Sequence, residues 1–97
     1  MKLYDICKEI AQIGEKLYTG EIDYEIGKLT RVTKSNHPCG ILNEILSIIG
    51  WDVYAGKTPT KEKIQETIEA LEEFQTVLCV DLSKQIQNLK EHLIEEE

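Results

Sequence analysis

A histidine and a cysteine stand two residues apart in the segment His37-Pro38-Cys39, where an imidazole and a thiol could together bind a metal ion. A structural zinc site needs four such ligands, and a catalytic site usually needs three. The side chains that could complete the set come from distant parts of the chain: Cys7, Cys79 and His92. We therefore interpret His37 as a turn residue and Cys39 as a buried residue at the start of a helix, and we expect no metal and no cofactor.

Three glutamates raise the alternative of a metal-dependent enzyme. The segments Glu21-x-x-x-Glu25 and Glu44-x-x-Ser47 resemble in layout the EExxE and ExxD segments with which the all-helical nucleotide pyrophosphohydrolases hold magnesium. This resemblance implies a hydrolase in which Glu21, Glu25 and Glu44 carry the metal. Two ligand positions of that family are missing here. The alternative is therefore a degenerate all-α metal-dependent nucleotide hydrolase, and our prediction is that the chain is not an enzyme.

A row of four glutamates, Glu62, Glu66, Glu69 and Glu73, follows helical spacing in the last third of the chain. Like charges four residues apart on a helix repel each other by a few tenths of a kcal/mol per pair, so the row is mildly unfavourable by itself. It is either a solvated face or a surface that docks a basic groove, as inhibitors of nucleic-acid enzymes do. His37-Pro38-x-Gly40 is similar at three positions to a tetrapeptide of the colicin-nuclease immunity proteins, which are small, acidic and helical, although the surrounding helices do not align.

Two large aromatic residues, Trp51 and Tyr54, fall in a stretch that we predict to be a connector over residues 51–58. Aromatic side chains in such positions often anchor protein interfaces. The other interpretation is that Trp51 covers one end of the core. We include Trp51 and Tyr54 with the four glutamates as candidate partner-binding residues.

The charge of the chain is unevenly distributed. The net charge is −7; residues 1–58 hold seven basic and eight acidic side chains, whereas residues 59–97 hold four basic and ten acidic ones. An acidic chain repels phosphate backbones, so we expect no direct binding of nucleic acid and an attraction to basic protein surfaces. The three cysteines form no CxxC pair, and no apolar run is long enough to span a bilayer. We expect free thiols, a cytoplasmic location and no membrane contact.

The clearest structural signal lies in the last third of the chain. Apolar residues and one glutamine recur there at intervals of three and four, the spacing of one face of an α-helix. The row consists of Ile64, Ile68, Leu71, Gln75, Leu78, Leu82, Ile86, Leu89 and Leu93. One continuous helix over residues 60–95 would be about 54 Å long, more than a domain of this size can cover. The sequence therefore predicts a bend, with Val77–Ser83 as its place, an overhang, or a homodimer that pairs through Leu78, Leu82, Ile86, Leu89 and Leu93.

The remaining segments also favour helices. The spacing predicts a helix over residues 2–18 that ends at Gly20, and a strongly apolar, central helix over residues 39–49 that ends at Gly50. Thr58-Pro59 is typical of the start of the last helix. Residues 21–34 favour a helix through Ile22, Ile26, Leu29 and Thr33, with a β-hairpin around Gly27-Lys28 as the alternative.

These patterns predict a mainly α fold: one domain over residues 1–97, built as a small bundle of three to four helices with a long amphipathic C-terminal helix. The function that they favour is a non-enzymatic protein-binding module, of the kind represented by small acidic immunity, antitoxin or phage anti-defence inhibitors. A structural homodimer and the degenerate hydrolase are the alternatives.

Overall fold

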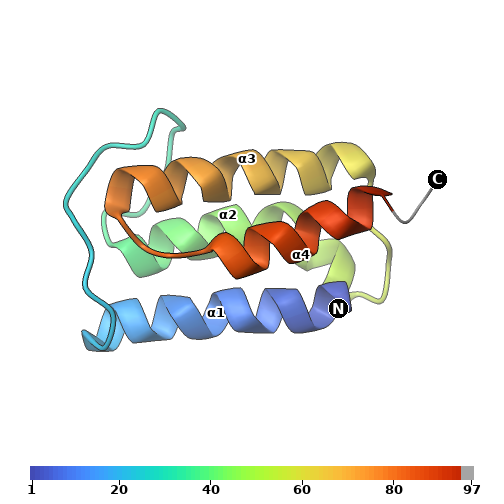
Figure 1. Ribbon diagram of the computed structural model, residues 1–97, viewed down its shortest axis with the longest axis horizontal. Helices are drawn as coiled ribbons and strands as arrows, with labels where there is room; N and C mark the ends of the chain where they lie inside the picture. Colours follow the sequence, from blue (N-terminus) through green and yellow to red (C-terminus); the bar gives the residue numbers. More distant parts are fainter. Residues whose placement is uncertain (95–97) are drawn as a thin grey trace.

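The computed structural model describes residues 1–94 and forms a bundle of four helices: α1 (Leu3–Thr19), α2 (Pro38–Tyr54), α3 (Lys61–Leu78) and α4 (Ser83–Ile94). The helices run alternately up and down, and each packs against its two neighbours in the cyclic order α1, α2, α3, α4 (Figure 1). No strand occurs among the described residues. The predicted fold class, a small helical bundle, is confirmed.

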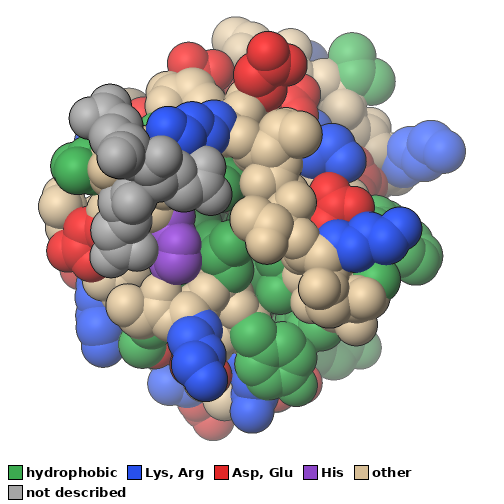
Figure 2. Space-filling model, turned by 90° about the vertical axis from the view of Figure 1, so that its right-hand side faces the viewer, with side chains coloured by type: hydrophobic (Ala, Val, Ile, Leu, Met, Phe, Trp, Pro, Cys, Tyr) green, Lys and Arg blue, Asp and Glu red, His purple; other side chains and the backbone are tan. Residues whose placement is uncertain are grey.

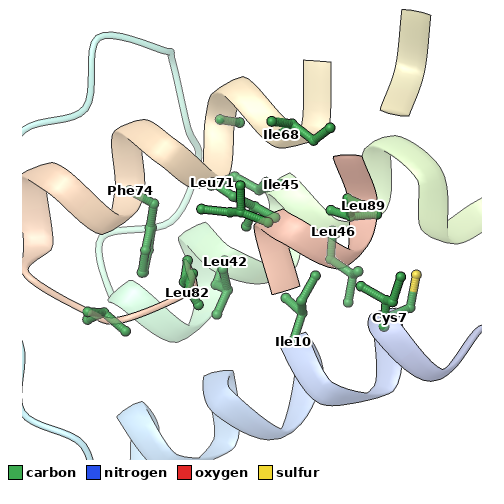
Figure 3. Packing of buried hydrophobic residues seen from close by; sticks show 14 of the residues in the cluster. Cys7, Ile10, Leu42, Ile45, Leu46, Ile68, Leu71, Phe74, Leu82 and Leu89 are labelled. Atoms are coloured by element: carbon green, nitrogen blue, oxygen red, sulfur yellow. The ribbon is translucent and has the colours of Figure 1, made fainter. Parts of the chain in front are cut away.

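The core is built almost entirely from isoleucine and leucine side chains at helical spacing. Each helix contributes to one continuous cluster, in which Ile10 of α1, Ile45 of α2, Leu71 of α3 and Leu89 of α4 have no exposed surface. Phe74 is the largest fully buried side chain (Figure 3). Burial of a residue of this kind stabilises the fold by about 1.5–3 kcal/mol, so the amphipathic pattern accounts for the bundle.

The C-terminal segment is two helices and not one. α3 ends at Leu78, Cys79 adopts a left-handed conformation with φ 55°, and α4 begins at Ser83. The break falls inside Val77–Ser83, where the sequence predicts a bend. It lets α4 fold back along α3 in a molecule only 38 Å long, which a helix of about 54 Å would have overhung. The predicted end near residue 95 lies outside the described residues.

Residues 20–37, which we call the strap, form neither of the predicted structures. They run without helix or strand from the end of α1, past α3, to the start of α2 (Figure 1). The helical interpretation is wrong because Ile26, one of its four apolar positions, is 97% exposed, while only Ile22 and Leu29 pack against the core. The hairpin is also wrong, because the backbone amide of Glu25 donates to the carbonyl of Leu78, 2.9 Å away, and not to a second strand.

Two predicted helix boundaries are corrected and one is confirmed. Gly20 ends α1 with φ 84°, as expected of a left-handed cap. α2 does not stop at Gly50; it continues to Tyr54, so residues 51–54 are helical, and the left-handed residue that follows is Gly56. The last part of the chain begins its helix at Lys61, with the hydroxyl of Thr60 as the cap instead of Thr58.

Candidate protein interface

The thiols and imidazoles of the chain are not brought together. Cys7 is buried in α1, Cys39 lies in the first turn of α2, and Cys79 lies between α3 and α4; all three are free. The Nδ1 atom of His37 accepts a hydrogen bond from the amide of Cys39 at 3.0 Å, so this imidazole caps α2. His92 contacts the backbone of Met1 instead. Within residues 1–94, no three His, Cys, Asp or Glu side chains gather where they could hold a metal ion.

Neither Cys7 nor Cys79 is an activated nucleophile. Burial raises the pKa of the Cys7 thiol from 9.0 to about 11, because the thiolate would lose its hydration. A hydrogen bond to Glu25 raises the pKa of the Cys79 thiol. Reactive cysteines have a lowered pKa, so these two side chains do not have the protonation behaviour of a catalytic thiol.

The glutamates of the hydrolase alternative are placed apart. Glu21 and Glu25 lie on the strap, whereas Glu44 lies on α2. Both carboxylate oxygens of Glu44 accept hydrogen bonds from the backbone amide of Lys34, at 3.0 and 3.1 Å. Glu44 therefore holds the last part of the strap on α2, and this role is structural.

The acidic row divides into two parts. Glu73 is half-buried, and its carboxylate accepts hydrogen bonds from the backbone amide and the hydroxyl of Thr30, so it holds the middle of the strap on α3. Glu62, Glu66 and Glu69 are exposed. The two ion pairs of the described residues, Lys63 with Asp52 and Lys90 with Glu72, leave all three of these carboxylates without a cation within 4 Å.

Glu66 and Glu69 form a ridge between two grooves. On one side, a groove of about 300 Å³ is bounded by the strap residues Arg31 and Val32 and by Ala70 of α3. On the other side, a shallower groove reaches Leu93 of α4 and also includes Glu62 at the start of α3. We call this surface the acidic ridge. It has negative charge at its crest, a mainly apolar flank that reaches Leu93 and also includes Lys61, and a mainly polar flank beside Arg31 and Val32.

The strap adds two features to the acidic ridge. Val32 is 94% exposed and presents an apolar side chain beside the carboxylates. Arg31 lines the same groove, and its Nε is buried without a hydrogen-bond partner among the described residues. Such an orphaned buried donor is uncommon. Because this Nε has almost no accessible surface, an acceptor from outside the chain could reach it only if the strap moved.

A second surface, which we call the aromatic face, lies on α2. It consists of Asn43, Leu46, Ser47, Gly50, Trp51 and Tyr54, which line a groove of about 280 Å³. Trp51 is 81% exposed and Tyr54 is 54% exposed, so Trp51 does not cover the core. The ring of Tyr54 meets that of Tyr4 on α1 edge to face, with 5.6 Å between centroids. Figure 2, a view of the end of the bundle where α2 stops, shows hydrophobic side chains at the surface among charged ones.

The two predicted groups of partner-binding residues do not form one surface. The aromatic face borders α1, whereas the acidic ridge borders the strap and α4, and α1 and α3 do not contact each other. Sequence reasoning also missed Tyr4, Val32 and Arg31 as members of these surfaces. The aromatic ring of Tyr4 and the charge of Arg31 could have suggested them, whereas no signal in the sequence marks Val32 as exposed.

The residues predicted as an oligomer interface belong mainly to the core of the chain itself. Leu78, Leu82, Ile86 and Leu89 are buried between the four helices, and Leu93 is half-buried. A second chain could reach the first four only if the bundle opened. The fold-back of α4 thus removes the reason for which this interface was predicted.

Comparison of the chain with protein-family models, with curated proteins and with solved structures finds no match. None of the helices within residues 1–94 is long and apolar enough to cross a membrane.

Proposed function

We propose that this chain is a non-enzymatic protein-binding module that uses the acidic ridge to dock a basic surface of a partner protein. The observation that carries the proposal is the ridge itself: two exposed carboxylates, Glu66 and Glu69, have no cation within 4 Å and are flanked by a groove on each side, although Arg31 and Lys61 line these grooves. A face that served only to keep the chain in solution would need charge, but it would not need the apolar groove at Leu93 or the exposed side chain of Val32.

The binding mode that fits this surface is the docking of an extended or helical segment. Lysine or arginine side chains of the partner would meet Glu62, Glu66 and Glu69, and an apolar side chain would enter the groove beside Val32. The net charge of −7 would speed the encounter with a basic partner and make the association rate fall with added salt. Small acidic inhibitors of the immunity, antitoxin or phage anti-defence kind act through such blocking contacts, and we place the chain in this functional class.

The test is a pair of charge-reversal variants of equal net charge. The chain is immobilised, its partner is captured from an extract of its own cells, and the dissociation constant is measured at 50, 150 and 500 mM salt. Exposed ion pairs contribute about 0.5 kcal/mol each, and a charge reversal replaces each attraction by a repulsion of similar size. Reversing two of them in Glu66→Lys/Glu69→Lys therefore weakens binding by about 2 kcal/mol, or about thirtyfold. The salt dependence should flatten at the same time.

The matched control is Glu15→Lys/Glu21→Lys, because Glu15 on α1 and Glu21 on the strap are also exposed. This variant has the same net charge as the ridge variant but leaves the ridge intact, so it should keep most of the affinity. Equal losses in the two variants would show that only net charge matters, and no loss in either would refute the proposed interface. Glu73 is left unchanged in both, since it holds the strap.

A further inference from the structure

The aromatic face of α2 is the uncharged side of a strongly charged protein. None of the six residues that line its groove carries a charge. α2 as a whole has two charged side chains, and both are engaged within the chain. Glu44 accepts from the amide of Lys34 at 3.0 Å, and Asp52 pairs with Lys63 at 2.9 Å. Lys8, over the ring of Tyr4 at 5.7 Å, marks the rim of the face.

This distribution of charge determines which occupant fits the face. Two copies of a chain with net charge −7 repel each other wherever acidic surfaces meet, and α3 alone carries five glutamates. The aromatic face is the place where a second copy can approach without placing like charges in contact. A basic partner would form no ion pair there, because no anionic side chain lines the groove.

We propose that the aromatic face is an interface between two copies of this chain, packed with α2 of one copy antiparallel to α2 of the other. Most homo-oligomers are two-fold dimers in which the same patch meets itself. The two-fold axis lies at Gly50 in the middle of the groove, where this buried residue is covered by the side chains of Tyr54 and Leu46. This axis places Tyr54 of each copy beside Leu46 of the other, with the indole of Trp51 entering the facing groove.

The area available sets the expected strength of the dimer. Full burial of an aromatic side chain covers 150–250 Å², so the exposed parts of Trp51, Tyr54 and Tyr4 supply about 400 Å² per copy. A standard stable interface buries about 800 Å² per partner. The flanking Asn43, Leu46 and Ser47 add to the area without reaching a large obligate interface. The dimer should therefore be reversible, with a dissociation constant of about 10–100 μM.

The test is the solution mass of the whole chain by sedimentation equilibrium between about 1 μM and 1 mM, a range that spans the expected constant. The mass of the wild type should rise from 11.1 kDa towards twice that value. Because Trp51 is the only tryptophan, its emission should shift to the blue over the same concentrations as the indole leaves water. Raising the salt from low to high concentration should leave the dimer intact or tighten it.

The decisive variant is Trp51→Glu, which places a charge on each side of the interface and should weaken the dimer by at least about thirtyfold. The control is Tyr18→Glu, which makes a similar change at an aromatic residue that is 74% exposed on α1. At concentrations where the wild type is monomeric, both should keep its melting temperature, since neither side chain is in the core.

Three results would overturn the proposal: a wild type that stays monomeric up to 1 mM, a Trp51→Glu variant that dimerises as the wild type does, or a dimer that high salt dissolves. A foreign protein captured at Trp51 by a monomeric chain would also overturn it and would assign the face to that partner. The mass measurement needs no partner protein, so its outcome is independent of the function proposed for the acidic ridge.

Discussion

The substitution Glu73→Ala should release the middle of the strap while leaving the bundle folded. The Glu73 carboxylate accepts from both the amide and the hydroxyl of Thr30, and no other hydrogen bond of the described residues links Thr30 to a helix. Hydrogen bonds to a charged group contribute about 1.5–3 kcal/mol. Because Thr30 is exposed and water can replace part of the loss, we expect the strap to open about 1–2 kcal/mol more easily.

The assay is limited digestion with trypsin, which cleaves after Lys28, Arg31 and Lys34 within the strap. When opening is fast relative to cleavage, the digestion rate follows the population of the open form. An opening cost that falls by 1–2 kcal/mol therefore predicts digestion that is about five to thirty times faster. The unfolding transition in urea should move much less, because the core residues of all four helices are unchanged.

The matched control is Glu69→Ala, which removes a glutamate one turn earlier on the same helix. Its carboxylate contacts Gln65 and makes no bond to the strap. Equal digestion rates in the two variants would refute the anchoring role of Glu73, as would a wild-type rate in Glu73→Ala. Glu73→Gln should lie between the wild type and Glu73→Ala, because an amide oxygen still accepts but carries no charge.

Three further predictions concern buried and capping groups. Burial raises the pKa of the Cys7 thiol to about 11 in the folded chain, so the thiol ionises at lower pH when the chain is unfolded. The free energy of unfolding should therefore be constant below about pH 9 and fall between pH 9 and 11. Urea titrations should show that Cys7→Ala flattens this fall. The Gln75 side chain accepts from the amide of Leu82 at 2.6 Å, and Gln75→Ala should lower stability by about 1–2 kcal/mol, as judged by thermal unfolding, unless water fully replaces that acceptor. His37→Ala should lose the α2 cap and about 1 kcal/mol, whereas His37→Asn should retain most of it, a difference that the same thermal assay would reveal or exclude.

The helices could be predicted from the sequence because their signals are local. The row from Ile64 to Leu93 follows the core-facing sides of α3 and α4. The break at Cys79 falls in the stretch of apolar residues followed by Asp81 and Ser83. The carboxylate of Asp81 accepts from the amide of Ser83 at 3.0 Å, a contact between residues two apart. Each of these features depends on residues within a few turns of one another.

The strap could not be predicted because its conformation depends on distant partners. Thr30 is held by a residue 43 positions later. Gly27 lies so close to α3 that a Cβ would meet the carbonyl oxygen of Val77 at 2.9 Å. The helical spacing of Ile22, Ile26, Leu29 and Thr33 was therefore coincidental. Gly50 leads to the opposite error, a helix predicted too short: it is typical of a helix end, but here it is a buried position within α2.

The candidate surfaces were only partly predictable for the same reason. The exposed glutamates follow from helical spacing alone. Spacing does not reveal that Glu73 is hydrogen-bonded to Thr30 or that Val32 lines the same groove as Glu66. The sequence predicts a connector at Trp51 because Gly50 is typical of the end of a helix. Once the helix continues, its spacing with Tyr54 places both rings on one outward face.

The positions of the residues that hold the strap also determine when the strap can form its native contacts during synthesis. α1 and the strap leave the ribosome first, yet the groups that hold the strap belong to Glu44, Glu73 and Leu78, all made later. The middle of the strap therefore lacks its contacts to α3 until residues 73–78 have emerged from the ribosome, although Glu44 can hold its last part earlier. A nascent chain arrested before Glu73 should therefore expose the middle of the strap to proteases that the finished protein resists.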